Sequence, residues 1–336
     1  MIATPPKLVR RLVVAPLILG AEATVVAASP ALGLLAVATS PLVGGRRPLR
    51  VLAIVVAYSA LHVVCTLACL GLWIASGFGR HADAPWVQRR HYALLRWFVG
   101  RIYRTLARVG RVDLRVTESE AAAEVLSGGE RPVVLLSRHA GEGDSLLVLH
   151  ELLCRHGRRP RVVLHEALRI DPLIDVLGAR LPNRFVDPRG GDTEAEIAAM
   201  ASDVGDDDAV LIFPEGANFT AARRLRGIAR LRHAGHHEEA GWADAMDHVV
   251  APRPGGTLAA LDAAPHADVV FLAHVGVPVG AREVWRRLPD RQTVEVRLWL
   301  APAAEIPADP DARIDWLFGW WRTVDAWVGE RHRAGS

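Results

Sequence analysis

A long run without charged residues near the N-terminus places the strongest constraint on how this chain folds. Val51–Phe78 contains no Asp, Glu, Lys or Arg, and Tyr58 and His62 are among its few polar interruptions. About 20 apolar residues are enough to cross a bilayer as a helix. The sequence therefore predicts a membrane helix over Val51–Phe78.

A second apolar stretch precedes this helix. Leu12–Val43 is rich in alanine and is interrupted by Glu22 and by three prolines. It fits either one tilted span or two short helices hinged at Ser29-Pro30, and both remain open at this stage. A cleavable signal peptide fits poorly, because the apolar stretch is too long and another follows at once.

Arginines flank both apolar segments, so the positive-inside rule defines no clean orientation. A two-span hairpin leaves the N-terminus and the bulk of the chain on one side, which we expect to be the cytoplasmic face of the cell membrane. A shallow re-entrant pair that never crosses the bilayer is the alternative, and it explains the basic connecting loop better. The flanking residues are Arg10, Arg11, Arg46, Arg47, Arg50, Arg80, Arg89 and Arg90.

Residues 81–111 have the pattern of a basic amphipathic helix. Between Trp86 and Val109, apolar side chains recur at helical spacing on one face and arginines occupy the other. Such a helix lies either at the level of the lipid headgroups or on a sheet with its arginines in solvent. The apolar face holds Val87, Leu94, Leu95, Phe98, Ile102 and Leu106, and the basic face Arg89, Arg90, Arg96, Arg101, Arg104 and Arg108.

From residue 112 onward, short apolar strands alternate with helical patterns. This alternation predicts an α/β fold with a mixed, largely parallel sheet flanked by helices, preceded by the N-terminal helical membrane segment. The expected strands are Val112–Val116, Pro132–Ser137, Arg161–His165, Arg184–Val186, Ala209–Phe213, Asp268–Gly276 and Thr293–Leu300. The expected helices are Ser145–His156, Thr193–Val204, Ala221–His233, Gly256–Ala263 and Asp311–Glu330.

The chain therefore divides into membrane helices over residues 1–80, the basic helix over 81–111 and an α/β domain over 112–336. The last helix is rich in tryptophan, which packs on the domain or lies at a membrane interface. Three cysteines, two of them in the apolar run, imply no disulfide framework.

Several classes of site are disfavoured. The net charge of +3 is small, and we find no nucleic-acid module, phosphate-binding P-loop or dinucleotide fingerprint. We therefore expect no nucleic-acid partner. A cluster of histidines and glutamates lacks the second half of a metal site and fits a solvated loop, so no metal is expected. The cluster comprises His233, His236, His237, Glu238 and Glu239.

Two strand ends carry the residues that point to chemistry. His139 follows the apolar run Val133–Leu136, and Asp144 comes five positions later with two glycines between them. The carboxylate can fold back onto the imidazole, hold it in one tautomer and leave its other nitrogen free to take a proton. The second strand ends in Phe213-Pro214-Glu215-Gly216. Both turns are expected at one carboxyl edge of the sheet, where α/β proteins place their sites.

His139 and Asp144 form an H-x4-D arrangement, and Phe213-Pro214-Glu215-Gly216 follows about 75 residues later. Together with the apolar segment that precedes them, these motifs resemble those of the glycerolipid acyltransferases. This family includes lysophosphatidic acid acyltransferase. The resemblance implies that His139 is the general base on an acceptor hydroxyl and that Asp144 orients it. A core histidine capped by Asp144 is the structural alternative.

The resemblance also implies a set of substrate contacts. Glu215 would bind the acceptor, with a helix cap as its structural alternative, and Gly216 would let a ligand approach the backbone. Arg189, with Arg184 in reserve, corresponds to the family's phosphate-binding arginine, although the spacing is one residue longer than usual. Arg253 follows a Pro turn and is a further candidate phosphate contact.

The expected activity is acyl transfer from acyl-CoA or acyl-carrier protein, as co-substrate and without a bound cofactor, to a lysophospholipid hydroxyl. The favoured acceptor is 1-acyl-glycerol-3-phosphate, and membrane lipids are the expected partners. The altered second motif keeps another acceptor open, a glycolipid or a different lysophospholipid. A non-catalytic membrane scaffold is the alternative from another class. A serine hydrolase is disfavoured, since neither Ser137 nor Ser145 sits in a G-x-S-x-G turn.

Overall fold

The computed structural model describes residues 4–141, 143–187, 192–278, 280–288 and 290–334. The chain forms two compact units, each assembled from separate stretches of sequence. The first unit comprises Met1–Asp113, Arg161–Gly191 and Arg282–Gln292. The second unit comprises Leu114–Pro160, Asp192–Ala281 and Thr293–Ser336.

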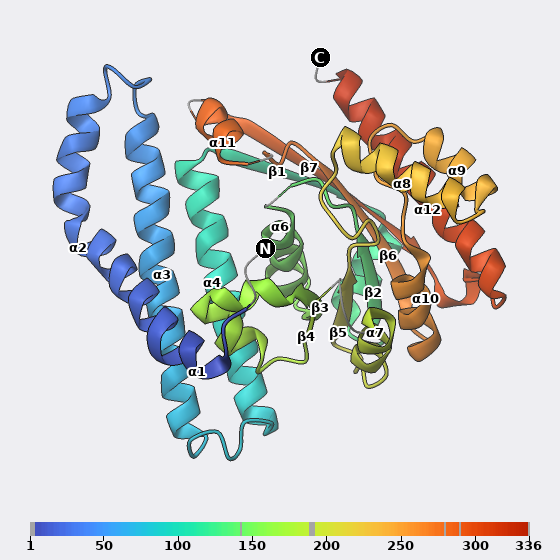
Figure 1. The fold of residues 1–336 in the computed structure, drawn as a ribbon, viewed down its shortest axis with the longest axis horizontal. Coiled ribbons are helices and arrows are strands. Elements are labelled where there is room, and N and C mark those ends of the chain that lie inside the picture. Colours follow the sequence, from blue (N-terminus) through green and yellow to red (C-terminus); the bar gives the residue numbers. More distant parts are fainter. Residues whose placement is uncertain (1–3, 142, 188–191, 279, 289, 335–336) are drawn as a thin grey trace. The chain divides into compact units, whose positions relative to one another are not determined.

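Long helices dominate the first unit, and Figure 1 shows α2, α3 and α4 side by side in it. The first apolar segment is one continuous helix rather than two short ones, because it passes through Pro30 without a break. It and α3 are both long and apolar enough to span a membrane. The elements are α1 (Lys7–Val9), η1 (Arg10–Val14), α2 (Ala15–Thr39), α3 (Arg47–Ala75) and α4 (Pro85–Val109).

Several polar residues of α3 face inward, whereas several of its apolar residues face outward. Ser59, His62 and Thr66 are buried, whereas Val64, Leu67 and Leu70 are about half exposed. The buried imidazole of His62 contacts Oε2 of Glu22 on α2 at 2.7 Å and Oδ1 of Asp171 at 3.2 Å. Helices in lipid have this distribution, since polar groups there must find partners inside the protein.

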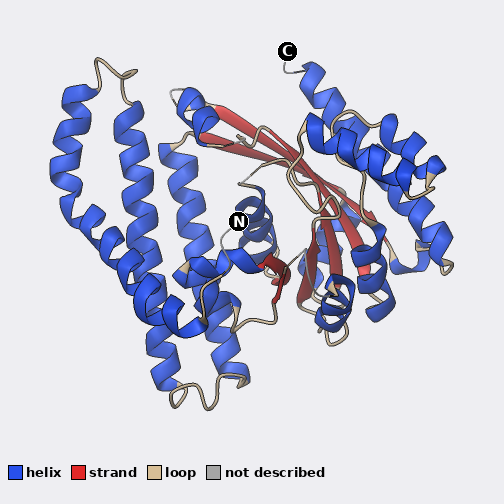
Figure 2. Ribbon diagram, in the orientation of Figure 1, coloured by secondary structure: helices blue, strands red, loops and turns tan. Residues whose placement is uncertain are grey.

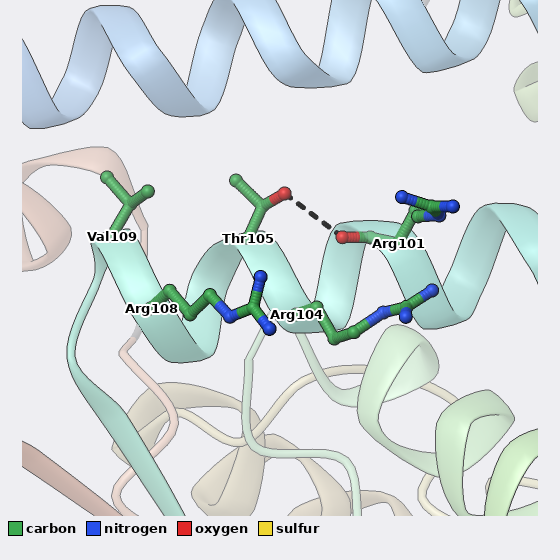
Figure 3. Close-up of a pocket in the computed structure, with 5 residues that line it drawn as sticks. All are labelled: Arg101, Arg104, Thr105, Arg108 and Val109. Carbon is green, nitrogen blue, oxygen red and sulfur yellow. Dashed lines mark hydrogen bonds between the residues drawn. The ribbon is translucent and has the colours of Figure 1, made fainter.

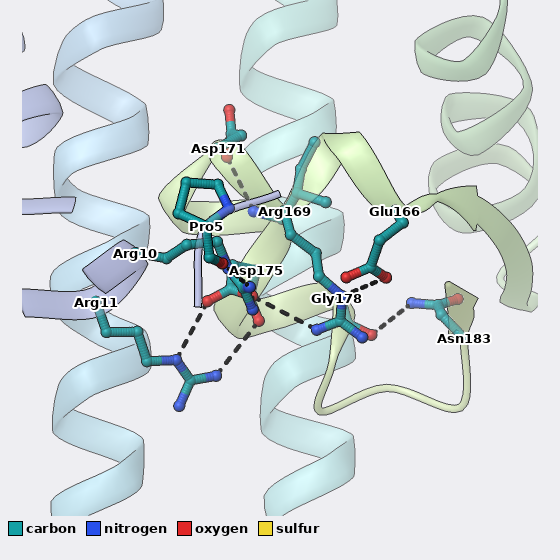
Figure 4. Close-up of polar contacts among 10 residues, drawn as sticks. Pro5, Arg10, Arg11, Glu166, Arg169, Asp171, Asp175, Gly178 and Asn183 are labelled. Carbon is teal, nitrogen blue, oxygen red and sulfur yellow. Dashed lines mark hydrogen bonds and ion pairs between the residues drawn. The ribbon is translucent and has the colours of Figure 1, made fainter. Parts of the chain in front are cut away.

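A buried carboxylate ties the N-terminal helix to a distant stretch of the same unit. Asp175 lies in the helical segment η4 (Ile174–Gly178), and Figure 4 shows guanidinium groups of Arg10, Arg11 and Arg169 directed at it. Arg10 Nη2 lies 2.7 Å from Oδ1 and Arg11 Nε 3.2 Å from Oδ2. Burial alone would raise the pKa of Asp175, but the hydrogen bonds from Arg10 and Arg11 lower it by more than burial raises it, so the pKa lies below its ordinary value.

The basic segment forms the helix α4, as its periodicity predicted. Val87, Val99 and Ile102 are buried on its apolar face. Arg101, Arg104 and Arg108 project from one side of α4 around a shallow hollow that Thr105 and Val109 complete (Figure 3). Whether this arginine face meets lipid headgroups stays a prediction. The first unit also contains η3 (Glu166–Ile170), α11 (Ala281–Arg287) and the parallel pair β3 (Arg159–His165) and β4 (Arg184–Val186).

Within the described residues, seven strands form a mixed, mostly parallel sheet flanked by helices, which confirms the predicted fold class (Figure 2). In the second unit the strand order is β1-β7-β6-β2-β5. Strand β2 pairs in parallel with β5 and with β6, and β6 pairs antiparallel with β7. The strands are β1 (Val112–Glu118), β2 (Val133–Ser137), β5 (Asp208–Ile212), β6 (Asp268–Val275) and β7 (Gln292–Ala301).

The central strands β2 and β5 are buried along their whole length, as apolar strands covered on both faces must be. The sequence pattern does not predict α5, α9 and α11 or the short segments η3, η4 and η5, and α9 occupies part of the stretch for which a solvated loop is predicted. The helices of the second unit are α5 (Glu120–Gly128), α6 (Asp144–His150), η2 (Glu151–Arg155), α7 (Thr193–Ala201), α8 (Ala221–His233), α9 (His237–Asp244), α10 (Pro254–Ala263), η5 (Ala303–Glu305) and α12 (Pro310–Ala334).

The tryptophan-rich C-terminal helix α12 packs on the sheet. The Trp320 ring stacks on Phe271 of β6 with centroids 4.6 Å apart, and Trp321 is fully buried. The Trp321 indole N–H donates to the carbonyl of Val250 at 3.1 Å. Of the two interpretations of this helix, packing on the domain therefore agrees with the structure.

Candidate active site

The turn between β2 and α6 brings His139 and Asp144 together. His139 Nδ1 lies 3.1 Å from Asp144 Oδ2, and the same oxygen accepts the backbone N–H groups of Ala140 and Gly141. Because Oδ2 is an acceptor, we assign the proton of the imidazole to Nδ1. No described residue bonds Nε2, and the ring is 22% exposed, so Nε2 is available as a base toward a substrate.

Asp144 is held as a carboxylate. Its side chain is fully buried, and burial alone would raise its pKa. The hydrogen bond from His139, the nearby imidazole of His274 and the N–H of Gly141 outweigh burial and bring the pKa of Asp144 below its usual range. A permanent negative charge beside Nδ1 stabilises the imidazolium that forms when Nε2 takes a proton.

The second strand-end motif clamps the backbone of His139. Glu215 Oε1 accepts the His139 N–H at 3.0 Å, while the His139 carbonyl accepts the N–H of Phe219 at 2.7 Å. The Phe213 ring lies against the imidazole with centroids 4.6 Å apart. The loop after β5 therefore fixes the main chain and one ring face of His139.

The carboxylate of Glu215 is engaged with the protein rather than directed at an open space. It is 1% exposed, and Oε2 accepts the N–H of Val250 at 3.0 Å. Burial raises the pKa of Glu215 to about 8, against the opposing effects of its two backbone N–H donors and Arg138. These bonds join three loops, and the contact with the acceptor that the resemblance implies for Glu215 stays a prediction.

Arg253 and Gly216 lie beside each other at the same turn. The Arg253 N–H donates to the carbonyl of Pro214 at 2.8 Å. A Cβ at Gly216 would come within 3.3 Å of the guanidinium of Arg253, so the missing side chain makes room for it. Partial burial, and then the charge of Arg230, lower the pKa of Arg253. The guanidinium of Arg253 beside Gly216 forms a basic corner next to the His139 loop.

The other predicted contacts are placed differently. Arg184 is the exposed first residue of β4 in the first unit, and Arg189 lies outside the described residues. Ser137 is fully buried, with its hydroxyl donating to the carbonyl of Arg138 at 3.1 Å, and Ser145 is exposed on α6. The geometry thus groups His139, Asp144, Glu215 and Arg253 within the second unit.

Two residues of the site were missed from the sequence. Arg138 is buried, and its guanidinium donates to the carbonyls of His274 at 2.7 Å and His248 at 2.9 Å. Burial lowers the pKa of Arg138, and the charges of Glu215, Asp144 and Asp325 counteract this shift. Arg138 therefore supplies a positive charge close to two buried carboxyl groups. His274, the second missed residue, lies behind Asp144.

Comparison with known proteins agrees with this geometry. Residues 113–250 match the family model of the acyltransferases, so this segment is similar to the domain that the model describes. The matched segment contains His139, Asp144 and Glu215, whereas Arg253 and His274 follow it. No curated protein matches the chain.

Proposed function

We propose that this protein is a membrane-bound O-acyltransferase that moves a fatty acyl group from a thioester to the free hydroxyl of a lysophospholipid. The favoured acceptor is 1-acyl-glycerol-3-phosphate, and the product is phosphatidic acid. The observation that carries the proposal is the 3.1 Å contact between His139 Nδ1 and Asp144 Oδ2, within a matched acyltransferase domain. Acyl-CoA or acyl-carrier protein is the donor.

The reaction needs one base and no acyl-enzyme. His139 Nε2 takes the proton of the acceptor hydroxyl as its oxygen attacks the thioester carbonyl, and a C–O bond forms. The imidazolium is stabilised by Asp144 through Nδ1. When the tetrahedral intermediate collapses, the C–S bond breaks and the thiolate receives the proton from Nε2. The imidazole is thereby restored, and holding alcohol and thioester together supplies much of the remaining acceleration.

The basic corner at Gly216 suits a phosphate-bearing acceptor. The guanidinium of Arg253 remains charged at neutral pH and can bind two phosphate oxygens at once. Its backbone is hydrogen-bonded to Pro214 in the turn that also carries Glu215, so it belongs to the loop that fixes His139. Arg184 and Arg189 are the other proposed phosphate contacts.

The two apolar helices agree with a site that meets its acyl chains at a membrane. Both substrates partition into lipid, so an interfacial enzyme encounters them at high local concentration. We propose the cell membrane as the location, with the catalytic domain on the cytoplasmic side.

The proposal is tested with the full-length protein in detergent or vesicles. Thiol release from acyl-CoA is measured with lysophosphatidate and then with lysophosphatidylcholine, lysophosphatidylethanolamine and a glycolipid as acceptors. We expect acceptor-dependent thiol release, fastest with lysophosphatidate, and phosphatidic acid as the lipid product. Faster transfer to an acceptor without a terminal phosphate would refute the acceptor assignment, and no transfer to any of them would favour a scaffold.

A further inference from the structure

His274 is a fully buried histidine near the carboxyl end of β6, a strand in the interior of the sheet. It lies in β6, which runs parallel to β2 with Ser137 opposite Leu272. His274 is two residues beyond Leu272, just as His139 is two residues beyond Ser137. The parallel register therefore brings the two histidines to the same level at the carboxyl edge of the sheet, one in β6 and one just beyond the end of β2.

The imidazole of His274 faces the carboxylate that orients His139. Its Nε2 lies 3.4 Å from Asp144 Oδ1 and 3.3 Å from the carbonyl oxygen of Arg138. Both of these atoms are acceptors, so we assign the proton of His274 to Nε2. Arg138 holds the same residue from the other side by donating to its carbonyl at 2.7 Å.

The two oxygens of Asp144 differ sharply in their surroundings. Oδ2 faces three donors, namely His139 Nδ1 and two backbone N–H groups. Oδ1 is buried and makes no fully formed hydrogen bond with any described residue, and the donor that faces it is His274 Nε2. A small rotation of the carboxylate or of the His274 ring would complete this bond, as often happens in catalytic sites when substrate binds.

We propose that His274 is a positioning residue for the acyl transfer. Its Nε2–H holds Asp144 Oδ1, so that Oδ2 stays directed at His139 Nδ1 and His139 keeps Nε2 free as the base. This inference rests on the proposed function. Arg138 and Glu215 are the charged groups that interact with Asp144 besides the two histidines, and neither donates to Asp144 Oδ1 within the described residues.

Two substitutions separate positioning from simple packing. His274→Phe fills the site but removes the donor, whereas His274→Gln keeps an N–H near the place of Nε2. We expect His274→Phe to lower kcat roughly tenfold to a hundredfold, at or below the contribution of the general base itself, with KM changed less than twofold. We expect His274→Gln to retain at least a third of the wild-type kcat. Equal losses in both variants, or no loss in His274→Phe, would overturn the proposal.

A spectroscopic measurement covers the case in which the variants fail to fold or the wild type transfers no acyl group. In the wild-type protein with 15N-labelled histidines, we expect the His274 proton on Nε2 and the His139 proton on Nδ1, with signals assigned through their backbone connectivity in the wild-type protein itself. A proton on Nδ1 of His274 overturns the proposal even if the enzyme is active. The predicted pattern in a protein without acyl transfer would uphold the positioning contact while the proposed function fails.

Discussion

Replacing Asp144 by asparagine removes the negative charge that faces His139 and leaves the shape of the side chain almost unchanged. The amide nitrogen cannot occupy the place of Oδ2, because it would meet three N–H donors there. It therefore takes the place of Oδ1, opposite His274 Nε2 at 3.4 Å. The amide oxygen still accepts from His139 Nδ1, but the imidazolium formed during the reaction loses its counter-charge.

The size of the effect follows from the distance. Two unit charges about 4 Å apart interact by about 4 kcal/mol at an effective dielectric constant near 20. Since each 1.36 kcal/mol is a factor of ten in rate, we expect kcat to fall about a thousandfold. The assay is the initial rate of thiol release at saturating acyl-CoA and acceptor, with melting temperature as the check on folding. Asp311→Asn, an exposed position in the first turn of α12, is the matched control. A folded Asp144→Asn enzyme with kcat within threefold of the wild type would refute the assigned role.

Three further outcomes follow from other parts of the structure. Folding raises the pKa of Glu215 from 4.5 to about 8, so the contribution of this group to stability is greatest below pH 4.5 and falls as the pH rises toward 8. The loss is on the order of 5 kcal/mol at most. Thermal melts across this range should show a decline in melting temperature that Glu215→Gln abolishes. Asp175→Ala leaves the buried guanidinium of Arg10 without its partner and should cost about 3–5 kcal/mol, measured as a lowered melting temperature in detergent. Gly216→Ala puts a side chain at φ 68° and against Arg253, so the KM for a phosphate-bearing acceptor should rise several-fold.

Each of these predictions can be contradicted by a specific result. For Glu215, equal pH dependence in the wild type and Glu215→Gln would show that another group titrates. For Asp175, a melting temperature within about 2 °C of the wild type would mean that the ion pair adds little to the stability of the fold. For Gly216, the matched variant is Gly235→Ala, which also has a positive φ but has nothing within 4 Å of an added Cβ. A KM that rises equally in both glycine variants would assign the effect to backbone strain.

Much of the fold could be predicted from local pattern. The strands β2, β5 and β6 are apolar runs that are buried on both faces, and such runs are recognisable without knowledge of their neighbours. Polar helix α9 was missed because its histidines and glutamates carry no apolar stripe to mark it. The division into two units was beyond local reasoning, since it depends on contacts such as that between Arg10 and Asp175.

The candidate site likewise contains residues whose placement could be predicted from the sequence and residues whose placement could not. His139 and Glu215 lie in the turns that follow two paired parallel strands, and Asp144 begins the helix after the first turn, so their approach could be expected from the topology of a parallel sheet. The partners of Glu215 were not foreseeable, because Val250 and His139 offer backbone N–H groups that any residue has. His274 lies in an apolar strand, where a histidine only interrupts the apolar pattern. The register of β6 against β2 is needed to show that it faces Asp144.

The central claim is that the imidazole of His139 takes the proton of a lipid hydroxyl. It is tested most directly by comparing wild type, His139→Ala and the exposed control His266→Ala in an assay that follows thiol release and lipid product together. We expect acceptor-dependent release with one acylated lipid per thiol in the wild type and in His266→Ala. In a folded His139→Ala protein we expect a loss of about a hundredfold or more. Undiminished lipid product from that variant would contradict the account.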